Sequence, residues 1–192
     1  MIRSTLALAL LLATALPAAA VEPALPGDSM YQVEATLTDQ RGATVDWNSL
    51  RGQPRVISMF YANCHLMCPM IIESGKSLQK QLAKAGSGTI DVTMLSLDPA
   101  RDTPQALAEV AATHRLDDAH WQLLRPRSSD VRTLASVLNI RYRAQPDGTF
   151  NHTSTLILLD PQGREIARDD VEGLHPDPAF VARVKDTLAA QP

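Results

Sequence analysis

Hydrophobic residues along the chain follow two periods. Stretches that alternate, or that are apolar throughout and short, predict strands. Residues recurring at three- and four-residue spacing predict helices. The expected strands are residues 31–37, 44–47, 55–61, 89–97, 121–124, 150–159 and 165–169, and the expected helices are residues 69–86, 103–114, 128–138 and 178–189. Such alternation is typical of an α/β protein with a mainly parallel sheet.

The first two expected strands flank a turn at residues 39–42, where Gly42 can adopt a positive φ. This pattern predicts an opening β-hairpin before the alternating part of the chain.

The N-terminal 20 residues have a different pattern, typical of an export signal. Arg3 gives a positive start, residues 6–16 are almost wholly apolar, and residues 18–20 are small. The apolar stretch is shorter than the roughly 20 residues that a membrane-spanning helix needs. We therefore expect a signal at 1–20, a short linker at 21–29 and one domain at 30–192, with export to a periplasm. Tethering by an uncleaved signal is the less favoured alternative.

The charge balance excludes one class of partner. The whole chain carries 18 basic and 21 acidic residues, and its net charge of −3 argues against binding to nucleic acid. The length beyond the signal suits one domain, and we expect a monomer.

The chain has two cysteines, Cys64 and Cys68, directly after the expected strand 55–61. Pro69 suits the first position of a helix, so we expect the helix N-terminus to favour a thiolate at Cys68. The pair could close as a disulfide or bind a thiophilic metal. A purely structural disulfide is the weakest interpretation, because so short a loop removes little entropy from the unfolded chain.

A strand, a dithiol at a helix N-terminus, a further β-α-β unit and a closing hairpin with a helix resemble the thioredoxin fold. Within it, residues 60–69 (FYANCHLMCP), 97–104 (LDPARDTP) and 151–153 (NHT) resemble the three signatures of the Sco/SenC copper proteins. The resemblance covers residues 31–188 and implies a central mixed sheet flanked by helices, with an N-terminal hairpin.

The resemblance also implies that Cys64, Cys68 and His152 are copper ligands. Two thiolates and an imidazole suit Cu(I), and they can hold Cu(II) with a further ligand. Two positions depart from the common pattern of the family. His65-Leu66 replaces Pro-Asp after the first cysteine, and Asn151 replaces the Asp before the ligand histidine. Both changes remove a carboxylate, which is consistent with a divergent branch serving a different copper enzyme.

Other candidate residues have simpler interpretations. His65 is expected to be an exposed loop residue rather than a spare ligand, Met67 is kept as an accessory ligand candidate, and Arg101 is expected to pair with a nearby carboxylate. Asp102 or Thr103 is expected to cap the helix that begins near Pro104. Core residues are expected at Met59 and Met70, and surface histidines at His114, His120 and His175.

The resemblance implies a metallochaperone that passes copper to a copper-site subunit of a respiratory enzyme, with cytochrome c oxidase as the leading recipient. A thioredoxin-like protein is the expected reductant of the dithiol. The alternative is an enzyme, a thiol-disulfide reductase in which Cys64 attacks and Cys68 resolves, or the reverse. Thioredoxin-like reductases generally use Cys-x2-Cys and place a proline where this chain has His152-Thr153. The sequence therefore favours copper binding over catalysis.

Overall fold

The computed structural model describes residues 24–64 and 67–191. The predicted export signal and His65 lie outside the described residues. The proposed division into signal, linker and domain therefore stays a prediction.

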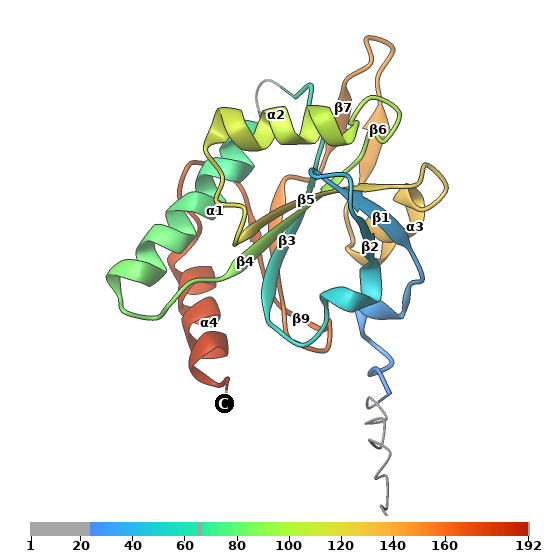
Figure 1. Cartoon of the computed structure of the whole chain (residues 1–192). Helices are drawn as coiled ribbons and strands as arrows, with labels where there is room; N and C mark the ends of the chain where they lie inside the picture. Colours follow the sequence, from blue (N-terminus) through green and yellow to red (C-terminus); the bar gives the residue numbers. More distant parts are fainter. Residues whose placement is uncertain (1–23, 65–66, 192) are drawn as a thin grey trace, which may run out of the picture.

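A seven-stranded mixed sheet forms the centre of the protein (Figure 1), in the order β2-β1-β5-β4-β3-β8-β9. Strands β3, β4 and β5 are parallel, while β1 and β8 run antiparallel to their neighbours β5 and β3. The strands are β1 Thr36–Asp39, β2 Thr44–Asp46, β3 Arg55–Phe60, β4 Asp91–Ser96, β5 Trp121–Pro126, β8 Thr155–Leu159 and β9 Glu165–Asp170. The predicted α/β class is confirmed.

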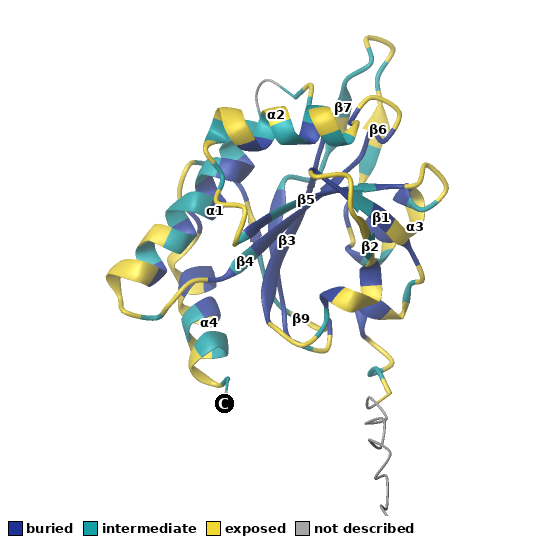
Figure 2. Cartoon of the chain, viewed as in Figure 1, coloured by how far each residue is buried: buried dark blue, intermediate teal, exposed yellow. Residues whose placement is uncertain are grey.

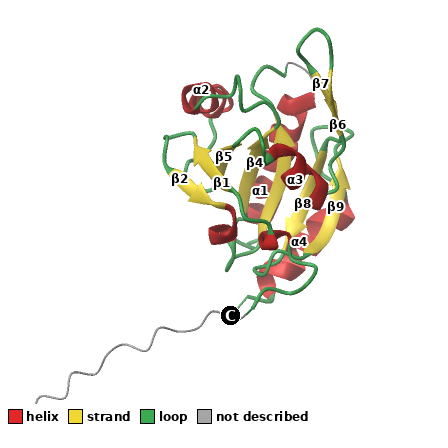
Figure 3. Ribbon diagram, turned by 90° about the vertical axis from the view of Figure 1, so that its right-hand side faces the viewer, coloured by secondary structure: helices red, strands yellow, loops and turns green. Residues whose placement is uncertain are grey.

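Helices cover both faces of this sheet (Figure 3). Three of them, α1 Met67–Lys84, α2 Pro104–His114 and α4 Pro178–Ala189, pack on one face, and α3 Val131–Val137 packs on the other. Adjacent residues of β3 serve the two faces in turn: Val56 joins the core under α1, and Ile57 joins the core under α3. Because both faces are covered, every residue of β3 and all but the first residue of β4 are buried (Figure 2). Within the described residues, no helix has the length and hydrophobicity needed to cross a membrane.

The N-terminal hairpin is confirmed, with Leu37 opposite Val45 and Gly42 at φ +83°. The expected start of its first strand is wrong. Tyr31 lies instead in a 3₁₀ turn, η1 Met30–Gln32, capped by the Ser29 hydroxyl, which accepts a hydrogen bond from the Tyr31 N–H. The Tyr31 ring is buried edge-on against Trp47, and this long-range contact outweighs the local strand pattern.

The expected strand 150–159 is also wrong as a single element. It divides into β7 Phe150–His152 and β8, and β7 pairs with a strand that was not predicted, β6 Tyr142–Ala144, in a separate two-stranded sheet. At the break, the Thr153 N–H donates to the Arg141 carbonyl rather than to the central sheet. His152 therefore ends a hairpin of its own, which determines how it meets the cysteines.

Gly75 in α1 provides a test of the packing between this helix and the sheet. A Cβ at this position would lie 2.8 Å from Cη2 of Trp121, whose ring is held by a 2.9 Å hydrogen bond from its Nε1 to Gln79. We expect Gly75→Ala to lower the free energy of unfolding by about 1–3 kcal/mol through overpacking. This loss should appear despite a helix propensity that favours Ala by about 1 kcal/mol.

The matched control is Gly173→Ala, because an added Cβ there meets nothing within 4 Å. It should change stability by less than about 0.5 kcal/mol. Urea unfolding followed by circular dichroism measures both variants. Equal or higher stability of Gly75→Ala would contradict the packing described here.

Candidate metal centre

Three segments meet at the carboxyl end of the parallel strands, in the upper half of Figure 1. Cys64 lies in the loop after β3, Cys68 in the first turn of α1, and His152 at the end of β7. The thiol sulfurs and a ring nitrogen of the histidine all lie within 4.8 Å of one another. The three residues that the resemblance implied as copper ligands are thus brought together by the fold.

The two cysteines form no disulfide and differ in environment. Cys64 is half-buried, while Cys68 is 3% exposed. The Cys68 backbone N–H, at the start of α1, donates to Cys64 Sγ at 3.2 Å. The helix N-terminus therefore stabilises negative charge on the Cys64 sulfur.

This arrangement corrects the expectation that the helix primes Cys68. The neighbouring Cys64 and burial together raise the pKa of the Cys68 thiol. The spacing of the cysteines was informative, but the direction of one backbone N–H reverses their roles. We therefore expect Cys64 to be the more reactive thiol in the metal-free protein and Cys68 the protected one.

His152 presents one ring nitrogen to the thiols. Its Nδ1 lies 3.0 Å from the Thr153 carbonyl oxygen, and its Nε2 lies 3.8 Å from Cys68 Sγ. A carbonyl can only accept, so we assign the ring proton to Nδ1. The Nε2 lone pair then faces the sulfurs, as a metal-binding histidine requires.

Aromatic side chains form one wall of the site, and the sequence analysis did not find them. Tyr61 is buried, and its ring packs 5.3 Å from that of Phe150 and 6.0 Å from that of His152. Burial raises the pKa of Tyr61, and the two thiols raise it further. In the sequence, the feature that could have indicated this role is the position of Tyr61, directly after β3 and before the cysteine loop. This wall limits the access of water to the thiols.

The loop that follows β4 supports the cysteine loop. Asp102 is 1% exposed, and its carboxylate accepts hydrogen bonds from the Ala62 N–H (3.1 Å) and the Ser96 hydroxyl (2.6 Å). Burial raises the pKa of Asp102. Of the two expected helix caps, Thr103 is the one observed, since its hydroxyl accepts from the Ala106 N–H. The expected ion pair of Arg101 is confirmed, with Asp98 as its partner.

The remaining methionine and histidine candidates lie outside the three-residue cluster. Met59 is fully buried in β3, and Met70 packs against the core, as expected. Met67 is the first residue of α1, and its role as an accessory ligand stays a prediction. His175 is exposed beside Ser77, and His114 is half-buried near Glu73.

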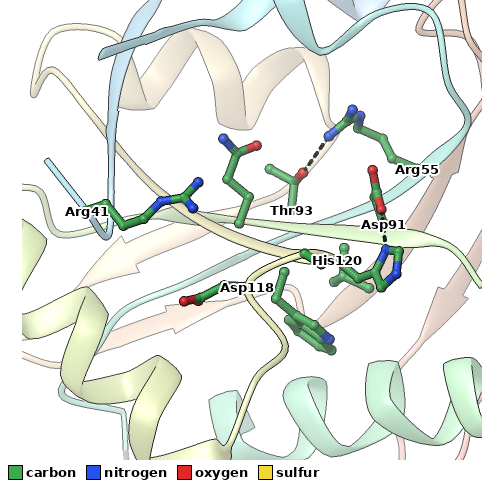
Figure 4. A pocket seen from close by; sticks show the side chains of 10 residues that line it. Arg41, Arg55, Asp91, Thr93, Asp118 and His120 are labelled. Atoms are coloured by element: carbon green, nitrogen blue, oxygen red, sulfur yellow. Dashed lines mark hydrogen bonds and ion pairs between the residues drawn. The ribbon is translucent and has the colours of Figure 1, made fainter. Parts of the chain in front are cut away.

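His120 lies at the opposite end of the parallel strands, in a polar hollow of about 200 Å³ (Figure 4). Its Nδ1 is 2.9 Å from Asp91, and Arg55 donates to Thr93 in the same hollow. These groups interact with one another, and they lie at the end of the strands opposite the cysteines.

A thioredoxin-like sheet with a dithiol at its first long helix, faced by a histidine from a separate hairpin, defines a class of thioredoxin-like proteins equipped to bind a soft metal. More specifically, the chain belongs to the SCO1/SenC family, whose family model matches residues 25–188.

Individual relatives agree with this assignment. The chain is 30% identical to the SCO1 protein homolog of Bacillus subtilis, over 70% of this chain and 71% of that protein. It is 26% identical to a Stutzerimonas stutzeri protein whose name proposes that it binds copper, over 66% of this chain and 63% of that protein.

Solved structures show the same fold. BsSco, described as having a disulfide switch and as a member of the Sco family of cytochrome c oxidase assembly proteins, is 26% identical, with a TM-score of 0.68 and coverage of 83% of this chain and 94% of that one. Arabidopsis thaliana ScoI, solved with copper bound, is 15% identical with a TM-score of 0.71, over 83% of this chain and 98% of that one.

The difference between the two thiols can be measured by alkylation. We compare Cys68→Ser, which leaves Cys64, with Cys64→Ser, which leaves Cys68. Cys64 should react with iodoacetamide at least about tenfold faster, because it is accessible and receives the helix N–H. Mass spectrometry over time gives both rates, and unfolded samples of the two variants serve as controls. Equal rates, or a faster Cys68, would refute the assigned asymmetry.

Proposed function

We propose that this protein is a copper chaperone that holds one copper ion through Cys64, Cys68 and His152 and delivers it to a respiratory copper enzyme, with cytochrome c oxidase as the proposed recipient. The observation that carries the proposal is the convergence of two sulfurs and one imidazole nitrogen within 4.8 Å. Family membership and the copper-binding name of the Stutzerimonas stutzeri relative support it.

The ligand set favours copper over zinc. Structural zinc sites use four protein ligands, usually cysteine and histidine. Among the described residues, no further histidine, cysteine or carboxylate joins these three in one cluster. Two soft thiolates and one imidazole match the trigonal coordination that Cu(I) accepts. Binding releases protons, because the sulfurs bind metal as thiolates.

The unequal burial of the three ligands implies an order of exchange. Cys64 is accessible, His152 ends a hairpin outside the central sheet, and Cys68 is buried. An incoming thiolate or imidazole would replace Cys64 or His152 first and Cys68 last. Copper then passes between proteins through shared ligands without being released as a free ion.

The sequence and the family support a proposed compartment and proposed partners. The export signal expected at residues 1–20 supports a periplasmic protein, with tethering by an uncleaved signal as the alternative. The relative BsSco is described within a family of cytochrome c oxidase assembly proteins. We therefore infer a copper-site subunit as the recipient and a thioredoxin-like protein as the reductant of the dithiol.

A thiol-disulfide reductase is the second candidate, and the accessible Cys64 beside the buried Cys68 favours one direction for it. The Cys64 thiolate would attack a target disulfide and form a mixed disulfide, releasing one target thiolate. Cys68, after losing its proton, would then attack Cys64 and release the second target thiolate. The target gains two electrons, and a Cys64–Cys68 disulfide remains.

Anaerobic titration with Cu(I) tests the chaperone function. The reduced protein should bind one copper per chain. Competition with a Cu(I) chelator should show an affinity lowered by at least about tenfold in His152→Ala, because one of three ligands is lost. His175→Ala is the matched control, since that exposed histidine lies outside the cluster, and it should bind as the parent protein does.

The two functions give different results in this experiment. Weak copper binding, or equal affinities of His152→Ala and the parent protein, would contradict the three-ligand site. If such a protein also reduced disulfides with a dependence on both cysteines, the reductase function would take its place.

A further inference from the structure

The loop between β4 and α2, residues 97–103, is built rigidly, and the proposed function does not use it. The Asp98 N–H donates to the Ser96 hydroxyl at 3.0 Å, and the Asp102 N–H donates to the Asp98 carbonyl at 2.9 Å. Both aspartates are buried. These contacts give the Arg101 side chain a fixed starting point.

On one side, this loop is attached to the cysteine segment. The Leu97 N–H donates to the Phe60 carbonyl at 2.7 Å, and Asp102 accepts from the Ala62 N–H, two residues before Cys64. The cysteine loop and the loop after β4 therefore behave as one unit.

On the other side, Arg101 reaches the tip of the β6–β7 hairpin. Its Nε donates to the Asp98 carboxylate, and its Nη2 donates to the Gly148 carbonyl, 47 residues away in sequence. Gly148 has φ +82°, and a Cβ there would lie 2.6 Å from Arg101 Nη1. Glycine at this position allows the guanidinium group to approach the backbone closely.

The hairpin needs such an anchor because it is not part of the central sheet. It has three residue pairs, including Tyr142 opposite His152. A two-stranded ribbon is marginally stable by itself. Packing of Phe150, which flanks the turn, on Tyr61 holds one side of the hairpin, and the hydrogen bond from Arg101 to Gly148 holds the turn itself.

We propose that Arg101 is a positioning residue that fixes the β6–β7 hairpin to the loop after β4 and so keeps His152 over the dithiol. The inference rests on the proposed function, because His152 acts there as a copper ligand. The inference also gives Arg101 a role in regulating copper transfer. While the contact between Arg101 and Gly148 holds, His152 dissociates from the metal slowly. When this contact breaks, an incoming ligand can replace the histidine.

Arg101→Ala tests this role with two measurements. Amide hydrogen exchange of the metal-free protein should become at least about tenfold faster in residues 142–152 and stay unchanged in the central sheet. Transfer of copper to an excess of Cu(I) chelator should become about three- to tenfold faster, with one copper still bound per chain. The absorption of the Cu(II) form should also change, because the geometry of the imidazole ligand is altered.

Two further substitutions separate the contact from charge alone. Arg101→Lys keeps a positive charge beside Asp98 but loses the planar fork that serves both partners, so it should give intermediate rates. Arg183→Ala is the matched control. Arg183 is exposed on α4, forms no ion pair within the described part of the chain, and should give parent rates.

Unchanged hairpin exchange and unchanged copper transfer in Arg101→Ala would overturn the proposal while leaving the copper site intact. If Arg101→Ala fails to fold, Gly148→Ala breaks the same contact from the hairpin side and decides the question. If the parent protein binds no copper, the proposed function fails, and the control of copper transfer fails with it. Hairpin exchange then still shows whether Arg101 positions His152.

Discussion

The buried carboxylate of Asp102 is the constraint on which the arrangement of the site depends. A carboxylate that is 1% exposed is costly unless its oxygens are hydrogen-bonded. Here the partners are the Ser96 hydroxyl at the end of β4 and the Ala62 N–H just beyond β3. Satisfying this group therefore requires the ends of two neighbouring strands to adopt one relative position. The segment that carries Cys64 starts from that fixed point.

From this point, a second hydrogen bond sets the chemistry of the thiols. The chain turns after Ala62 so that the Cys68 N–H points at the Cys64 sulfur. An N–H at a helix N-terminus is otherwise without a partner, and it is well placed to stabilise a thiolate. One sulfur thus becomes accessible and charge-stabilised, while the other is buried with a raised pKa. A site for stepwise exchange benefits from this difference, since an incoming ligand meets the thiols one at a time.

The central elements could be predicted from the sequence because the local pattern of apolar residues is enough to indicate that they are buried. Strands β3 and β4 contain most of their residues in short, mainly apolar runs that are buried on both faces, and the helix from Thr103 carries its own cap. The errors fell where distant contacts decide the structure. Tyr31 turns because it packs on Trp47, and the expected strand 150–159 is interrupted because Thr153 bonds to Arg141 of the hairpin rather than to the central sheet. Three-residue β6 has too short a pattern to be recognised.

The same limit applies to the site. The cysteines and His152 could be named from motifs, and the fold brings them together. The roles of the two thiols could not be predicted, because they depend on the direction of a single N–H. The contact from Arg101 to Gly148 joins residues that no local pattern connects.

The charged groups around His152 bear on which oxidation state of copper the site would prefer. Asn151 stands where the family resemblance leads one to expect a carboxylate, and a hollow of about 540 Å³ beside it is lined by Arg141, Arg143 and His152. Both arginines are exposed. In the proposed complex, two thiolates and Cu(I) would carry one net negative charge, which neighbouring guanidinium groups would offset, whereas Cu(II) would bring an additional positive charge that they would repel. We therefore expect the surroundings of the proposed copper site to favour Cu(I) over Cu(II).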